Sequence, residues 1–153
     1  MYIYADNAAT TKTSQAAIKA MNECMEDFYG NPSSLHSVGQ RAAEKLLQAR
    51  MDVAECLGAD FKEIYFTSGG TESNNWAIRG AVEANKRNGN KIITTMVEHA
   101  SVKSPMKYLE NQGYEVTYLP VDEYGVVSID ALKEAMSEDT ILVSIMYVNN
   151  EVG

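Results

Sequence analysis

Apolar residues recur along the first third of the chain at the spacing of an amphipathic helix. In residues 14–29 they stand three and four positions apart, which predicts a helix with one buried face. Residues 36–57 predict a second helix, and Gly58 is placed to end it as a C-cap. The two buried faces would consist of Ala17, Ile18, Met21, Met25 and Phe28 in the first helix, and of Ala43, Leu46, Leu47, Val53, Ala54 and Leu57 in the second.

Strands and helices alternate in the rest of the chain. The pattern predicts strands at residues 63–67, 91–97, 114–119 and 140–148, and helices at residues 72–88, 104–112 and 129–136. Ser104-Pro105 and Ser128 are typical helix starts, and the nearly continuous apolar run 140–148 predicts a strand buried on both faces. Together these elements predict an α/β layered domain, with a mostly parallel mixed sheet flanked by helices.

Composition narrows the classes of protein that fit this pattern. The 153 residues are 45% hydrophobic and 22% charged, which is ordinary for a globular domain. A net charge of -8 argues against direct binding to nucleic acid. No apolar run approaches the roughly 20 residues needed to span a membrane, and the first residues lack the features of a signal peptide. We therefore expect a cytoplasmic protein.

The two cysteines, Cys24 and Cys56, are too few for a disulfide framework. Both fall within helical patterns, where a free cysteine behaves as a small buried hydrophobic residue. We expect neither to act as a nucleophile, and we assign no metal site.

The candidate chemistry lies in the loops that follow the predicted strands, because open α/β sheets bind ligands at the carboxyl ends of their strands. Residues 67–75 leave one strand and enter a helix. There Gly70 and Thr71 would present amide N–H groups and a hydroxyl at a helix N-terminus, which is a natural seat for a phosphate. An ordinary turn capped by Ser or Thr is the alternative.

His99 and Asn150 follow two other predicted strands. His99 comes just after the strand that ends at Val97, where an imidazole could stack on an aromatic cofactor and move protons. A structural or surface histidine is the alternative. Asn149 and Asn150 follow the apolar strand, where either a bound ligand or an ordinary turn would explain them. Since all three loops fall at strand ends of the same polarity, they can converge on one site.

Five segments resemble, in order and approximate spacing, the motifs of the cysteine desulfurase family. They are residues 4–11 (YADNAATT), 30–36 (GNPSSLH), 67–75 (TSGGTESNN), 98–101 (EHAS) and 148–153 (VNNEVG). The resemblance covers essentially the whole chain. It implies the N-terminal part of the large domain of a fold type I, class V aminotransferase-like enzyme that depends on pyridoxal 5′-phosphate.

The resemblance also implies roles for particular residues. Gly70 and Thr71 match the positions that hold the cofactor phosphate. His99 matches the histidine that stacks on the pyridine ring and assists proton transfer, and Asn150 matches an asparagine close to the ring and the substrate.

For the N-terminal segment, the resemblance implies that Asn7 and Ala8 line the substrate entrance. Residues 1–15 would form an arm near the small domain, and residues 16–153 would belong to the cofactor-binding large domain. The family removes sulfur from L-cysteine, gives L-alanine and carries the sulfur as an enzyme persulfide. That sulfur goes to acceptor or scaffold proteins for iron–sulfur cluster or thiolated tRNA synthesis, and the enzymes are dimers.

Three residues that this chemistry needs have no match in the chain. They are the cofactor-binding lysine in a serine-x-histidine-lysine context, the aspartate that pairs with the pyridine nitrogen, and the mobile-loop cysteine that takes the sulfur. None of the nine lysines has the required context. We therefore expect the chain alone to be inactive and to hold the cofactor non-covalently at most.

Two alternatives stay open beside a desulfurase fragment. One is a non-catalytic half that pairs with a complementary C-terminal chain, and the other is a different class V relative such as a selenocysteine lyase. In each case the apolar strand at residues 140–148 would expose an edge or a face when the chain is isolated, so we expect a homo-oligomer or a self-associating fragment.

Overall fold

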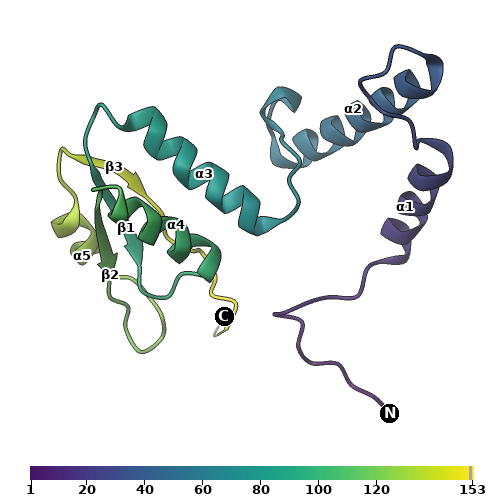
Figure 1. Ribbon diagram of the computed structural model, residues 1–153. Helices are drawn as coiled ribbons and strands as arrows, with labels where there is room; N and C mark the ends of the chain where they lie inside the picture. The colour runs from purple at the N-terminus through teal and green to yellow at the C-terminus, as the bar shows by residue number, and fades with distance from the viewer. Residues whose placement is uncertain (152) are drawn as a thin grey trace. The chain divides into compact units, whose positions relative to one another are not determined.

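The computed structural model describes residues 1–151 and residue 153; Val152, part of the 148–153 motif, lies outside the described residues. The described chain forms two compact units, Met1–Phe66 and Thr67–Gly153. Figure 1 shows both, the first purple to blue and the second teal to yellow.

Two helices form most of the N-terminal unit. α1 (Gln15–Asp27) begins after Ser14, whose side chain accepts a hydrogen bond from the Ala17 N–H. α2 (Ser37–Leu57) ends at Gly58, whose φ of 63° lies in the left-handed region that favours glycine. Both predicted helices and the predicted C-cap are therefore confirmed.

The buried faces predicted for these two helices are mostly wrong within this unit: Ala54 is buried, but the other predicted residues are exposed or half-buried. Met25 and Leu57 are 66% and 69% exposed, because an apolar helix face is buried only where a second layer packs on it. The described unit offers only the other helix and a short 3-10 helix, η1 (Phe61–Glu63), for that purpose. The expected burial of both cysteines is wrong for the same reason: Cys24 is half-buried and Cys56 is exposed.

The strand predicted at residues 63–67 is also wrong, because Glu63 ends η1 and the following residues are irregular. The Ile64 carbonyl accepts a hydrogen bond from the Arg50 guanidinium of α2. The same guanidinium lies 5.2 Å from the centre of the Phe66 ring. A strand needs a neighbouring strand to satisfy its backbone groups, and here a helix side chain satisfies one of them instead.

A three-stranded parallel sheet with helices packed on it forms the C-terminal unit (Figure 1). Its elements are α3 (Gly70–Asn85), β1 (Lys91–Thr95), α4 (Ala100–Asn111), β2 (Glu115–Leu119), α5 (Ile129–Ala135) and β3 (Thr140–Val143). β1 is central and pairs with β2 on one side and β3 on the other. The predicted α/β architecture with a parallel sheet is confirmed.

The central strand β1 is buried on both faces. Ile92 and Ile93 point to opposite faces, because side chains alternate along a strand, and both are fully buried. On the Ile92 face, side chains from α3 and α4 complete a core whose buried members are Ile78, Val82, Ile92, Val102, Met106 and Leu109. This core holds α3, α4 and β1 together, so the loops at their ends are held as well.

β3 is shorter and less buried than predicted. It ends at Val143, which is 39% exposed, because β3 is an edge strand of the described sheet. Ser144 N–H still donates to the Ile93 carbonyl at 2.9 Å. Beyond it, the Met146 N–H donates to the carboxylate of Glu98 at 2.6 Å. The side chain of Glu98 thus supplies a hydrogen-bond acceptor beyond the point where the backbone of β1 pairs with this segment.

α4 begins at Ala100, earlier than the predicted start at Ser104-Pro105. Its N-cap is His99, and Pro105 lies inside the helix. A proline cannot donate to the carbonyl four residues earlier, that of Ser101, yet the helix continues through it because the loss is limited to one bond near the first turn. Histidine is not among the preferred N-cap residues, so the Ser-Pro pair gave the more familiar signal.

Two glycines give a matched test of this packing. A Cβ at Gly89 would lie 2.2 Å from the Asp139 carbonyl oxygen, whereas a Cβ at Gly80, inside α3, would meet nothing within 4 Å. We expect Gly89→Ala to lower the free energy of unfolding by about 1–3 kcal/mol through overpacking. Gly80→Ala should raise it by about 0.5–1 kcal/mol, because alanine is the better helix former. Urea denaturation measures both, and equal midpoints for the two variants would contradict the close approach at Gly89.

Candidate functional site

The N-terminus of α3 leaves its first backbone amides available. Its N-cap is Gly69, which has no side chain to accept from them. The first intrahelical bond runs from Ser73 N–H to the Gly69 carbonyl at 3.1 Å, so the N–H groups of Gly70, Thr71 and Glu72 have no acceptor within the helix. By contrast, side chains cap the starts of α1, α2, α4 and α5.

The space over this terminus is open. Apart from the adjoining residues and the backbone of α3 itself, no described atom lies within 4 Å of the position that a Cβ at Gly69 or Gly70 would occupy. Thr71 adds an exposed hydroxyl beside the free amides. Backbone N–H groups at the positive end of a helix dipole suit a phosphate or another anion. Gly70 and Thr71 therefore have the surroundings that the sequence predicted for them.

Hydrogen bonds between side chains and backbone brace the loop that enters α3. The Ser68 N–H donates to the Glu72 carboxylate at 2.6 Å, and the hydroxyls of Thr67 and Ser73 lie 2.7 Å apart. The bond from the Ser68 backbone, followed by the Ser68 side chain, lowers the pKa of Glu72 below its usual value. Glu72 accordingly stays ionised through neutral pH, and the brace is lost only as the pH falls through that lowered pKa.

His99 caps α4 with its ring. Its Nδ1 accepts a hydrogen bond from the Ser101 N–H at 3.1 Å and lies 2.8 Å from the Ser101 hydroxyl. That hydroxyl accepts in turn from the side-chain amide of Asn74 on α3, also at 2.8 Å. One chain of contacts thus joins the imidazole to the helix that begins at Gly70. Asn74 and Ser101 lie in two of the sequence motifs, but no role was predicted for either, because no spacing rule pairs residues so far apart.

Glu98, next to His99, is a buried carboxylate with two donors. It is 3% exposed and accepts from the Thr95 hydroxyl at 3.2 Å and from the Met146 N–H at 2.6 Å. It therefore ties the end of β1 to the segment that follows β3. No role was predicted for Glu98 from the sequence, although a charged residue directly after a buried strand was a signal that could have identified it.

The paired asparagines behave differently from each other. The side-chain amide of Asn149 donates to the Val97 carbonyl at 3.1 Å, which links the two strand-end segments. Asn150, the predicted site residue, is exposed, and its amide donates to the neighbouring Glu151 carboxylate at 3.2 Å. The structure therefore brings Asn149 to the end of β1, while Asn150 lies beside it without a described contact to His99 or Thr71.

Asn7 and Ala8 lie in the N-terminal unit. They occupy an exposed turn closed by a bond from the Ala9 N–H to the Asp6 carbonyl at 3.2 Å. Their geometry is therefore that of a local turn.

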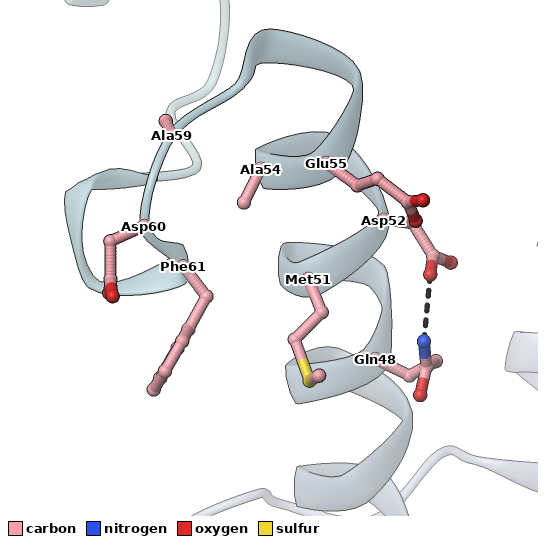
Figure 2. A pocket seen from close by; sticks show the side chains of 8 residues that line it. All are labelled: Gln48, Met51, Asp52, Ala54, Glu55, Ala59, Asp60 and Phe61. Atoms are coloured by element: carbon pink, nitrogen blue, oxygen red, sulfur yellow. Dashed lines mark hydrogen bonds between the residues drawn. The ribbon is translucent and has the colours of Figure 1, made fainter.

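A hollow of about 340 Å³ in the N-terminal unit has the wrong chemistry for an anion (Figure 2). Met51, Ala54 and Phe61 form an apolar part, next to the carboxylates of Asp52 and Glu55. Its lining also includes Asp60, Gln48 and Ala59 but no basic side chain. It holds none of the predicted site residues.

Among the described residues, every helix is too short or too polar to cross a bilayer. The same residues contain no group of three or more His, Cys, Asp and Glu side chains arranged to hold a metal ion.

The C-terminal unit therefore combines a parallel α/β sheet with an uncapped glycine turn at the start of α3 and a histidine cap at the start of α4. The chain belongs to the aminotransferase class-V family, whose family model matches residues 3–153. Enzymes of this family depend in general on pyridoxal phosphate. The resemblance seen in the sequence is thereby confirmed at the level of the family and the fold.

Curated relatives of the chain are cysteine desulfurases. It is 50% identical over 151 residues to "Cysteine desulfurase IscS" of Methanosarcina thermophila, covering 99% of this chain and 37% of that protein. It is 52% identical over 151 residues to the "NifS/IcsS protein homolog" of Lactobacillus delbrueckii subsp. bulgaricus, covering 99% of this chain and 39% of that protein. The chain thus spans less than two fifths of the length of these relatives.

Two solved structures are similar to this chain in both fold and sequence. A "NIFS-LIKE PROTEIN" superposes with a TM-score of 0.95 at 44% identity, covering 100% of this chain and 42% of that one. The structure described as "SspA in complex with cysteine" has a TM-score of 0.86 at 36% identity, covering 94% of this chain and 42% of that one.

Substituting Glu98 tests the tie between β1 and the segment after β3. Glu98→Ala removes an acceptor from the Thr95 hydroxyl and the Met146 N–H, which should lower the free energy of unfolding by about 1–3 kcal/mol. Hydrogen exchange at the Met146 amide should become faster in the same variant. Glu134→Ala, on the exposed surface of α5, is the control and should change neither value. Unchanged exchange at Met146 in Glu98→Ala would show that the tie does not hold this segment.

Proposed function

We propose that the chain forms the N-terminal portion of a pyridoxal-phosphate-dependent cysteine desulfurase. The observation that carries the proposal is the open N-terminus of α3, linked through Asn74 and Ser101 to the ring of His99. An anion seat and an imidazole held by one bridge suit a ligand that has both a phosphate and an aromatic ring. The relatedness to desulfurases selects pyridoxal phosphate among such ligands.

In this proposal the amides of Gly70 and Thr71, with the Thr71 hydroxyl, hold the phosphate. His99 lies against the pyridine ring and holds or moves a proton near the substrate, and Asn150 lies close to the ring. When bound, the cofactor supplies an electron-withdrawing ring that stabilises negative charge on the substrate. The residues of this chain orient that ring, since fixed donors need no reorganisation during the reaction.

The proposed reaction of the whole enzyme transfers sulfur from L-cysteine to an enzyme thiol. The carbon–sulfur bond of cysteine breaks, a sulfur–sulfur bond forms on the enzyme, and L-alanine and an enzyme persulfide result. The persulfide then supplies an acceptor or scaffold protein for iron–sulfur cluster or thiolated tRNA synthesis. The lysine, the aspartate and the acceptor cysteine of this reaction would come from residues that this chain does not contain.

The N-terminal unit has a place in the same proposal. Residues 1–15 would form an arm near the small domain, with Asn7 and Ala8 at the substrate entrance, and residues 16–153 would belong to the large domain. The exposed apolar side chains of α1 and α2 would then be covered by the rest of a dimeric enzyme in the cytoplasm.

The intact mass of the native protein, with peptide mapping beyond Gly153, is the direct test. A longer chain that carries the required lysine and cysteine is the expected result. A chain that ends at Gly153 would overturn the enzyme proposal for this molecule. Co-purification with a lysine-bearing partner would then support the alternative of two complementary halves.

The phosphate seat can be tested separately. In the complete protein, Thr71→Ala should weaken pyridoxal phosphate binding about tenfold or more, because a hydroxyl bond to a charged group contributes about 1.5–3 kcal/mol. The control is Ser137→Ala, an exposed hydroxyl deletion just before β3, at the amino edge of the sheet. Absorbance titration of the cofactor measures both, and identical affinities would remove Thr71 from the seat.

The 153-residue chain alone gives a complementary result. Borohydride treatment with pyridoxal phosphate, followed by mass spectrometry, should yield no adduct on one specific lysine, because the required lysine is not in this chain. A stoichiometric adduct on a single lysine would contradict this account of the site.

A further inference from the structure

The contacts around His99 determine which ring nitrogen carries its proton. A backbone N–H can only donate, so the bond from Ser101 N–H requires a lone pair on Nδ1. The side-chain amide of Asn74 donates a hydrogen bond to the Ser101 hydroxyl oxygen. The hydroxyl can then donate its own proton to Nδ1 of His99, which is its other partner. Both donors therefore require Nδ1 to be unprotonated, and a neutral ring must then carry its proton on Nε2.

We infer that Asn74 and Ser101 are positioning residues that hold His99 as the Nε2–H tautomer and tie its ring to α3. Ser101 is 7% exposed and Asn74 is half-buried, so little water competes for the bond between them, whereas the His99 ring is exposed. A proton on Nδ1 instead of Nε2 would break the hydrogen bond from the Ser101 N–H. It would also require the Ser101 hydroxyl to accept from the ring instead of donating to it.

The inference deepens the proposed function and, in its consequence for the reaction, rests on it. An imidazole held as Nε2–H presents a donor, so His99 would donate a hydrogen bond at Nε2 and could not accept one there. The bridge also connects the two ends of the ligand site. Asn74 lies one turn beyond the amides of Gly70 and Thr71, so the phosphate seat and the imidazole move together.

The chain contains its own reference histidine. It has two histidines, and His36 also caps a helix through Nδ1, which accepts from the Gly39 N–H at 3.3 Å. His36 is exposed, and that backbone bond is the single contact described for its ring. The two rings therefore differ in the hydroxyl bridge, which is the feature to be tested.

The experiment is nitrogen NMR of the chain labelled with 15N-histidine, in mildly alkaline solution where imidazole is neutral. The His36→Gln variant assigns the two sets of ring signals. We expect His99 to show an unprotonated Nδ1 and a protonated Nε2. A protonated Nδ1 on His99 in the unmodified chain would overturn the inference.

Three variants test the bridge. Ser101→Ala removes one of the two donors to Nδ1 and should lower the preference of His99 for the Nε2–H tautomer about fivefold, the change expected for one hydrogen bond of about 1 kcal/mol. Ser101→Thr keeps the hydroxyl and should restore the signals. Asn74→Asp turns the donor into an acceptor, so the Ser101 hydroxyl would donate to the new carboxylate and the His99 signals should move further toward Nδ1–H.

Ser104→Ala, an exposed hydroxyl deletion on the same helix, and the signals of His36 are the controls. Unchanged His99 signals in both Ser101→Ala and Asn74→Asp would overturn the role of the bridge, whatever the stability of either variant. The readout needs no cofactor. Failure of the complete protein to bind pyridoxal phosphate would therefore count against the proposed function alone, and a wrong tautomer would count against the bridge alone.

Discussion

The burial of β1 on both faces is the constraint on which the C-terminal unit depends. A strand that is hydrogen-bonded on both edges and covered on both faces cannot shift its register without exposing Ile92 or Ile93. Its carboxyl end is therefore a fixed point. Glu98, His99 and the carbonyl of Val97 all follow it within a few residues, and each makes a contact that depends on where β1 ends.

Hydrogen bonds from side chains replace backbone pairing beyond the carboxyl end of β1. Beyond the point where β1 stops pairing with β3, the carboxylate of Glu98 accepts a hydrogen bond from the Met146 N–H. The side-chain amide of Asn149 donates a hydrogen bond to the Val97 carbonyl. On the other side, Asn74 and Ser101 join the starts of two helices. The strand-end segments are thus held by side-chain hydrogen bonds rather than by sheet pairing.

The sequence predicted the parts of this fold that local pattern determines. The helices α1 and α2, the strand β2 and the cap at Ser128 follow from spacing and from familiar capping residues. The strand expected at residues 63–67 did not form, because strand formation depends on a partner, and Arg50 satisfies the Ile64 carbonyl instead. The start of α4 was misplaced because histidine is not among the preferred N-cap residues, whereas Ser104-Pro105 is a familiar helix start.

The candidate site was partly predictable for the same physical reason. Gly70, Thr71 and His99 stand beside strand or helix ends, where position in the chain determines position in space. The roles of Asn74, Ser101 and Glu98 depend on contacts between segments distant in sequence, such as the bond between Glu98 and Met146. Periodicity carries no information about such pairs.

The phosphate seat proposed at the start of α3 would be made mainly of backbone, and this affects how inherited variation could act on it. A side-chain ligand disappears with one codon change, whereas the N–H of Gly70 survives every substitution except proline. Most replacements at Gly69 or Gly70 would therefore act by occupying the open space over the turn rather than by deleting a ligand. Harmful alleles in this segment should be those that add bulk, and conservative changes should be tolerated even in the middle of a functional loop.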